Sequence, residues 1–141
     1  MHVREVMTAQ VVTAKPTSTL TEVARIMAQV ESGAVPVVDD SAVVGLVTDR
    51  DIVIRGIAAG LGLDSPVSGV MSDDVQTCAE DDNVADAAAK MGSHQIRRLI
   101  VLDAKGKLAG ILSLGDIAQD YGAKAVGHTL EEISEETAAA H

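Results

Sequence analysis

The sequence predicts an α/β protein built from two copies of one β-α-β-β-α unit, with short three-stranded sheets and helices packed on them. Two observations indicate this. Residues 45–52 read G-L-V-T-D-R-D-I, and residues 110–117 repeat the pattern as G-I-L-S-L-G-D-I. Upstream of the two copies, Met27 and Met91 also correspond, at nearly the same spacing. A pattern repeated at a nearly constant spacing sets the architecture of a chain, so one element order applies to both halves.

The first half begins with a predicted strand at residues 11–13, followed by a helix. Thr19 is a suitable N-cap, and Glu22 three residues later completes a capping box. The apolar residues that follow fall at helical spacing and give the helix one apolar face. Gly33 is expected to end this helix, since glycine commonly follows the last helical turn.

Two apolar runs follow, and they predict a hairpin. Residues 34–40 end in two aspartates, and residues 42–47 form the second run, so the pair has the pattern of two antiparallel strands. Residues 49–59 then predict a helix that is apolar on most sides. Such a helix is usually buried, so we expect it to form an interface with a second copy of the chain. A Gly- and Pro-containing stretch at 60–66 separates the halves.

The second half repeats this order, with Asn83 as the helix N-cap. The predicted domains are therefore residues 1–62 and residues 63–121, followed by an acidic C-terminal tail at 122–141. A half of about 60 residues buries little surface alone. We therefore expect the two repeats to pack about a pseudo-two-fold axis and to share a core.

The spacing also locates an insertion. The offset from Asp51 to Asp116 exceeds the offset from Met27 to Met91 by one position. A single residue was therefore added between these points in the second half, most simply in the predicted hairpin turn at 104–107.

Composition excludes several classes of protein. Of the 141 residues, 47% are apolar, which suffices for a core, and the net charge of −10 argues against nucleic acid as a partner. Cys78 is the only cysteine, so no intrachain disulfide can form, which favours a reducing compartment. No signal peptide and no apolar run of membrane-spanning length is present. We expect a soluble, cytoplasmic protein without membrane contact.

The repeated motif contains residues suited to a nucleoside phosphate. Thr48 lies where a strand gives way to a helix, and free backbone N–H groups at a helix start favour an anion. Asp51, one turn later, can accept hydrogen bonds from two ribose hydroxyls. Ser113 and Asp116 repeat the pair. The alternative is that the hydroxyls only cap helices and the carboxylates only complement helix dipoles.

The other candidate residues do not form a catalytic set. Cys78 has no recognisable base beside it and is expected to be a small core residue. The four histidines have no metal-like spacing, so no metal or other cofactor is expected. A small enzyme using Cys78 or the aspartates is the least favoured reading, because no nucleophile, base and acid come together.

These motifs resemble the cystathionine-β-synthase (CBS) domain, and two in tandem resemble a Bateman module. The resemblance covers residues 3–120. It is carried by V-M-T at 6–8 and V-M-S at 70–72, by A-V-P-V-V-D-D at 34–40, and by the two motif copies. The stretch 48–61 also resembles small stand-alone bacterial CBS-pair proteins, including hypoxia-response types.

The resemblance implies a regulatory module that catalyses no reaction. It would bind an adenine nucleotide (AMP, ADP or ATP) or a related adenosyl ligand in clefts between the repeats, and pass that state to an effector protein, which the sequence does not identify. The alternative is a ligand-free module for oligomerisation or protein docking. A homodimer through the motif helices is expected in either case.

The resemblance also assigns residues to parts of the ligand. Asp51 and Asp116 would hold ribose, and Thr48 and Ser113 would hold phosphate. Residues near the base would come from short strands, namely Thr13, Ala14, Lys15, Gly33, Ala34 and Val35 in the first half and Thr77, Cys78, Ile96, Arg97 and Arg98 in the second. Arg97 and Arg98 are either a phosphate clamp, for which arginine is suited, or surface charges.

Overall fold

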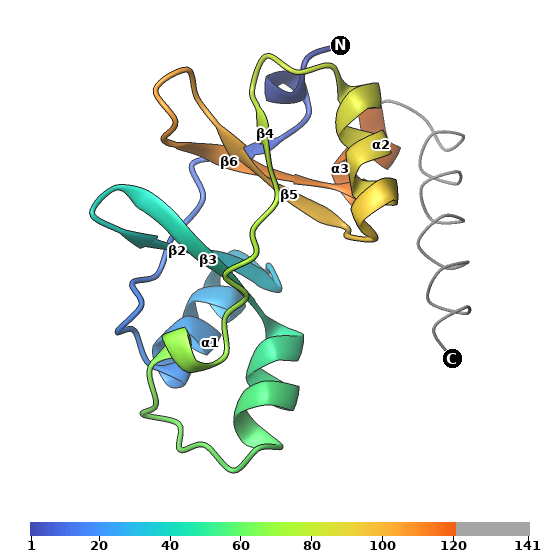
Figure 1. Cartoon of the computed structure of the whole chain (residues 1–141). Helices are drawn as coiled ribbons and strands as arrows, with labels where there is room; N and C mark the ends of the chain where they lie inside the picture. Colours follow the sequence, from blue (N-terminus) through green and yellow to red (C-terminus); the bar gives the residue numbers. More distant parts are fainter. Residues whose placement is uncertain (121–141) are drawn as a thin grey trace. The chain divides into compact units, whose positions relative to one another are not determined.

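The computed structural model describes residues 1–120, so the predicted acidic tail at 122–141 lies outside the described residues. The chain divides into two compact units (Figure 1). One, the first-repeat unit, is Val11–Val75. The other, the second-repeat unit, combines Met1–Gln10 with the described residues from Gln76 to Asp120. Among residues 1–120, no helix has the length and apolar character needed to cross a membrane.

The first-repeat unit contains a helix, a hairpin and a second, unusual helix. Helix α1 (Leu20–Val30) precedes strand β2 (Ala34–Asp39), which pairs antiparallel with β3 (Ala42–Thr48). The motif helix η2 (Asp51–Ile57) is a π-helix, and η3 (Val67–Gly69) is one turn of 3₁₀-helix.

Two local predictions for this unit are wrong. No strand forms at 11–13. Instead Ala14 makes a single parallel bridge to Val37, and Pro16, which has no N–H, stops the pairing from continuing. Helix α1 ends at Glu31, which adopts the left-handed conformation (φ 55°), and not at Gly33. The predicted N-cap is confirmed, since the Thr19 hydroxyl accepts a bond from the Glu22 N–H at 3.1 Å.

The second-repeat unit has a four-stranded sheet in the order β1-β6-β5-β4. Its elements are β1 (Thr8–Ala9), β4 (Thr77–Ala79), α2 (Val84–His94), β5 (Arg98–Leu102), β6 (Leu108–Ser113) and α3 (Leu114–Asp120). Strands β4 and β5 are parallel, and the other pairs are antiparallel. The sheets therefore have four and two strands, where three each were predicted.

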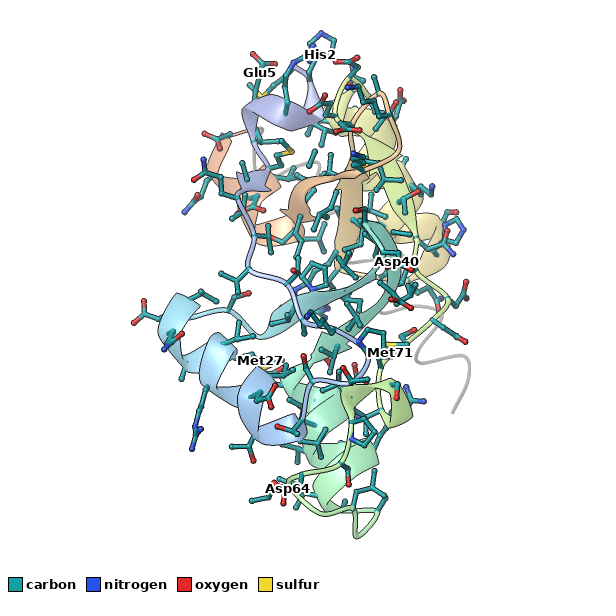
Figure 2. The ribbon with its side chains drawn as sticks, turned by 90° about the vertical axis from the view of Figure 1, so that its left-hand side faces the viewer. His2, Glu5, Met27, Asp40, Asp64 and Met71 are labelled. Atoms are coloured by element: carbon teal, nitrogen blue, oxygen red, sulfur yellow. The ribbon has the colours of Figure 1, made fainter. Side chains whose placement is uncertain are left out.

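The first residues of each repeat join the unit built mainly from the other repeat. They form a strand only in the second-repeat unit, because the equivalent pairings in the first-repeat unit, at Ala14 and Ser72, are single bridges. The N-terminal segment forms η1 (Val3–Glu5) and then β1, which pairs with β6. A bond from the His2 N–H to the Glu5 carboxylate, at 2.6 Å, closes the start of η1 (Figure 2). In the first-repeat unit the matching segment is η3 and Ser72, which bridges Leu46 of β3. We call these the leading segments, residues 1–9 and 66–72.

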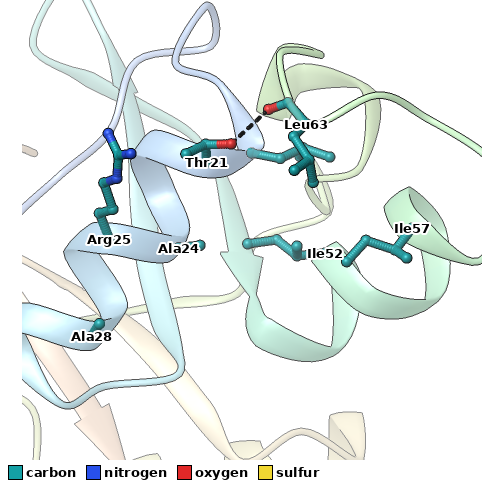
Figure 3. A pocket seen from close by; sticks show the side chains of 8 residues that line it. Thr21, Ala24, Arg25, Ala28, Ile52, Ile57 and Leu63 are labelled. Atoms are coloured by element: carbon teal, nitrogen blue, oxygen red, sulfur yellow. Dashed lines mark hydrogen bonds between the residues drawn. The ribbon is translucent and has the colours of Figure 1, made fainter.

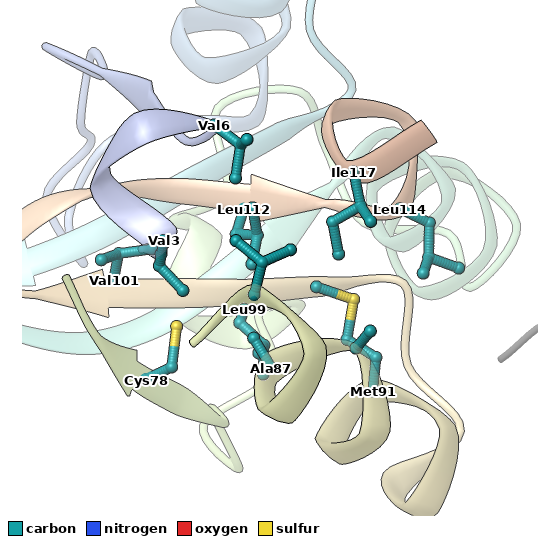
Figure 4. Close-up of a cluster of buried hydrophobic side chains, with 12 residues drawn as sticks. Val3, Val6, Cys78, Ala87, Met91, Leu99, Val101, Leu112, Leu114 and Ile117 are labelled. Atoms are coloured by element: carbon teal, nitrogen blue, oxygen red, sulfur yellow. The ribbon is translucent and has the colours of Figure 1, made fainter. Parts of the chain in front are cut away.

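The two cores use equivalent positions. The second-repeat core, shown in Figure 4, comprises Val3, Val6, Cys78, Val84, Ala87, Ala88, Met91, Leu99, Val101, Leu112, Leu114 and Ile117. The first-repeat core comprises Ala14, Leu20, Val23, Met27, Val35, Val37, Val47, Ile52, Val67 and Val70. Nearly every member of one set is the repeat equivalent of a member of the other. The repeat is therefore preserved in three-dimensional packing.

The hairpin turns confirm the predicted insertion. In the first repeat, Asp39 pairs with Ala42, leaving two residues in the turn. In the second, the Asp103 N–H donates to the Lys107 carbonyl at 2.8 Å, leaving three. The extra residue changes the loop and leaves the flanking strands in register.

Candidate functional site

The first copy of the motif forms a reciprocal cap at the end of β3. The Asp51 N–H donates to the Thr48 hydroxyl oxygen at 3.2 Å. The Asp51 carboxylate accepts in return, through Oδ2, from the Thr48 N–H at 2.9 Å. This is the geometry of a capping box, and it fixes the orientation of both side chains.

The second copy repeats the arrangement at the end of β6. The Asp116 N–H donates to the Ser113 hydroxyl at 3.1 Å, and the Ser113 N–H donates to Asp116 Oδ2 at 3.0 Å. The capping role that the sequence left open is therefore present in both repeats. It uses one carboxylate oxygen and leaves the other, Oδ1, outside the box.

One expectation about the first copy is wrong: its backbone N–H groups are not free for an anion. Those of Thr48 and Asp51 are used in the box. The Asp49 N–H donates to the Gly33 carbonyl at 2.9 Å, and the Arg50 N–H donates to the Asp49 carboxylate at 2.9 Å. The capping alternative anticipated the pairing of the Thr48 and Asp51 N–H groups, but not the long-range bond from the Asp49 N–H to Gly33.

The Asp51 side chain retains capacity for further bonds. It is 19% exposed, and its Oδ1 lies 4.0 Å from Nη1 of Arg55, one turn along η2. An ionised carboxylate has about four lone-pair positions. One of these is occupied by the Thr48 N–H, so ribose hydroxyls would find others available.

The strand residues predicted near the first copy divide into two groups. Ala34 lies opposite Thr48 in the β2–β3 ladder, and Gly33 accepts the bond from Asp49, so both lie beside the motif. A Cβ atom on Gly33 would lie 2.8 Å from the Asp49 carboxylate, a contact that rotation of this exposed side chain could relieve. Val35 and Ala14 are 1% and 4% exposed and belong to the core, so their side chains are not available to a ligand.

Thr13 and Lys15, the remaining predicted residues of this unit, are exposed on either side of Ala14. Lys15 lines a polar pocket of about 300 Å³ together with Pro16, Thr17, Val38, Asp39 and Asp40.

In the second-repeat unit, two arginines lie at the start of β5. Arg98 is the cross-strand partner of Ser113, and the Arg97 carbonyl accepts from the Leu114 N–H at 3.1 Å. Directly opposite residues in a ladder project from the same face of the sheet, so Arg98 lies beside the Ser113 hydroxyl. Ile96 packs against the core of this unit.

Cys78 is a core residue and not a reactive thiol. It is 8% exposed, and burial, assisted by the negative charge of Asp82, raises the pKa of its thiol to about 11 despite the nearby Lys90. Thr77, its neighbour in β4, accepts a bond from the Lys90 ammonium through its carbonyl. Sequence reasoning missed Lys90. The signal for it was the repeat itself, because Lys90 replaces Ile26 at the equivalent helix position.

The motif helix of the first repeat is less buried than expected. Only Ile52 and Gly56 are buried, while Val53, Ile54 and Ile57 are 52%, 51% and 54% exposed. An apolar groove of about 340 Å³ runs between α1 and η2 (Figure 3). Its lining consists of Leu20, Thr21, Ala24, Arg25, Ala28, Ile52, Ile57 and Leu63. Within residues 1–120, no three metal-ligating side chains come together.

Comparison with known proteins identifies the family. The CBS domain model matches residues 3–56 and 67–121, and the chain belongs to the CBS domain family as a tandem pair. The CBS domain-containing protein YhcV of Bacillus subtilis is 40% identical over 94% of both chains. The family accounts for the repeated motif and for the mixed α/β architecture with short sheets.

Solved structures of CBS-pair proteins share the fold. Hypoxic Response Protein I, with two coordinated zinc ions, has a TM-score of 0.77 at 32% identity over 85% of this chain and 98% of its own. PAE2072 of Pyrobaculum aerophilum, in complex with AMP, has a TM-score of 0.78 at 27% identity over 93% and 99%. The CBS pair of protein MJ0100, with 5′-methylthioadenosine and S-adenosyl-L-methionine, has a TM-score of 0.78 at 26% identity over 88% and 98%.

Proposed function

We propose that this protein is a cytoplasmic regulatory module that catalyses no reaction and binds an adenine nucleotide or a related adenosyl ligand at its two motif copies. The supporting observation is that both copies build the same hydroxyl–carboxylate box with one carboxylate oxygen outside it. That PAE2072 and MJ0100 carry adenosyl ligands supports the choice of ligand class.

The hydrogen bonds of the capping box indicate which group of the ligand each side chain would bind. The hydroxyl of Thr48 or Ser113 accepts from an N–H, so its own proton is free to be donated to a phosphate oxygen. The carboxylate of Asp51 or Asp116 is held by its Oδ2, and its Oδ1 accepts from ribose hydroxyls. The adenine base would lie against the neighbouring strand residues and be held by aliphatic contacts and backbone hydrogen bonds.

The protein would sense its ligand by binding it with different affinity in two arrangements. A ligand shifts a protein between two arrangements only to the extent that it binds one better than the other. The output would pass to an effector protein that prefers the ligand-bound arrangement.

Thermal unfolding with AMP, ADP, ATP and S-adenosyl-L-methionine tests the proposal. A ligand at 100 times its dissociation constant stabilises the fold by about 2.7 kcal/mol. Asp51→Asn and Asp116→Asn are the sharpest variants, because the asparagine carbonyl can still accept the capping bond. We expect at least one of them to show a smaller ligand-induced shift than wild type while remaining folded. A protein that no adenosyl compound stabilises would refute the proposal.

The apolar groove favours a second role, association through the motif helix of the first repeat. Leu61 and Leu63, 39% and 58% exposed, extend the apolar surface formed by Val53, Ile54 and Ile57. Exposed apolar patches of this kind mark association sites, and we propose that a second copy of the chain covers this one. Light scattering on Ile54→Glu should show a monomer where the wild type is a dimer. If ligands leave the protein unaffected while it dimerises, the docking module is the better description.

A further inference from the structure

A phosphate at the first motif copy must be bound by side chains. The N–H groups of residues 48–51 are all paired within the chain. The Thr48 hydroxyl can donate one bond, but it carries no charge. A phosphate dianion beside the Asp51 carboxylate therefore needs a cation close by.

Arg55 is placed to supply that cation. Residues four apart on a helix are neighbours on its surface, so residues 51 and 55 of η2 fall on one face. Its Nη1 lies 4.0 Å from Asp51 Oδ1 and donates to the Met71 carbonyl at 3.5 Å. Both contacts are at the long limit of their kind. The side chain is 53% exposed and has five donors, so most of its bonding capacity remains unused.

The second repeat has a different residue type at the position equivalent to Arg55. The residue equivalent to Arg55 is Asp120, which has the opposite charge. The residue equivalent to Arg98, which lies beside Ser113, is Ala34, which lies beside Thr48. Each motif copy thus has an arginine where the other copy has a different residue type, Arg55 on η2 in the first repeat and Arg98 on β5 in the second. A requirement for a cation at each site would produce this exchange.

We propose that Arg55 makes the first-repeat site selective for adenosine ligands that carry a phosphate, over uncharged 5′-methylthioadenosine and cationic S-adenosyl-L-methionine. This rests on the proposed function and specifies its ligand class. In the free protein Arg55 neutralises Asp51. When ribose hydroxyls occupy Asp51 Oδ1, the guanidinium can turn to the phosphate, which it can bind through two N–H groups.

Calorimetric titration with AMP and with adenosine tests this, in an Asp116→Asn background that removes the second site. Arg55→Gln should raise the dissociation constant for AMP by at least about tenfold and that for adenosine by less than about twofold, since a charge-assisted phosphate contact is lost. Arg55→Lys should restore part of the AMP affinity. Arg25→Gln, which removes the same charge from helix α1 and not from the motif, should leave both constants near wild type.

Two results would refute the proposed role of Arg55 and leave the proposed function intact. Equal weakening of AMP and adenosine, accompanied by a lower melting temperature, would show that Arg55 only holds the leading segment through Met71. Unchanged AMP affinity in Arg55→Gln would show that it makes no phosphate contact. Failure of wild type to bind either compound would refute the proposed function as well, so the two claims fail separately.

Discussion

Replacing Gly110 by alanine should destabilise the fold because the leading segment passes directly over this residue. Gly110 pairs with Ala9 in the β1–β6 ladder. A Cβ atom there would clash with the Thr8 carbonyl oxygen, and would lie 3.0 Å from Met7 Sδ and 3.2 Å from the Thr8 carbonyl carbon. The clash is with backbone, so a rotamer change cannot relieve it.

The expected cost follows from overpacking. Extra carbon forced into a packed site costs about 1–3 kcal/mol, and the upper part of that range applies here because β1 must move. Alanine regains about 0.5–1 kcal/mol of chain entropy relative to glycine. We therefore expect a net loss of about 2 kcal/mol, which lowers the melting temperature of a chain of this length by roughly 8 °C.

Urea unfolding monitored by circular dichroism measures this loss, with Gly69→Ala as the matched control. Gly69 also lies in a leading segment, but its added Cβ would meet no atom within 4 Å. That variant should unfold within about 0.5 kcal/mol of wild type. If Gly110→Ala is as stable as Gly69→Ala, the packing of the N-terminal segment onto β6 is wrong.

Three further predictions concern caps and titrating groups. Asp51→Ala should lower the free energy of unfolding by about 1 kcal/mol through loss of the cap, while Asp51→Asn should cost only a few tenths; calorimetric melting separates them. Because the pKa of Cys78 rises from 9.0 to about 11 on folding, the folded state keeps a proton that the unfolded state loses. Stability should therefore fall as pH rises through that window, and urea titrations of Cys78→Ala should show a smaller fall. N–H bonds from Lys107 and Lys105 lower the pKa of Asp103 below 3.8. The contribution of the ionised Asp103 to the free energy of unfolding should be present above pH 3.8 and be lost as the pH falls below it. Acid titrations of Asp103→Asn should lack this loss.

Much of the architecture was predictable because local signals and the repeat agreed. The helix beginning after Thr19, the hairpin after Gly33 and the single-residue insertion near Lys105 all follow from short stretches of sequence. Because the sequence repeats, the same helix and hairpin could be predicted in the other half. Family membership followed from the same motifs.

The exchange of leading segments was not predictable, because it depends on long-range pairing. Val3 and Val67 are both fully buried, yet each stands in a short stretch with no helical or strand periodicity. Nothing local indicates which sheet will receive them. The glycines at 45 and 110, which admit the segments closely, acquire that meaning only once the pairing is known.

The site was predictable in its residue types and less so in its bonding. The hydroxyl and carboxylate of each motif copy do come together, as the spacing indicated. The capping bonds of Thr48 and Asp51 are local and matched one of the two alternatives, whereas the bond from the Asp49 N–H to Gly33 depends on long-range folding. Apolar periodicity does not separate a π-helix from an α-helix over an element as short as η2.

The central claim, that the two motif aspartates hold an adenosyl ligand, is tested most directly by titrating AMP into wild type, Asp51→Asn, Asp116→Asn and the double variant. Circular dichroism first establishes that all four are folded, as the retained capping bond predicts. The account predicts that wild type binds AMP, that at least one single variant binds it more weakly, and that the double variant does not bind it. A folded double variant that binds AMP as tightly as wild type would contradict the account.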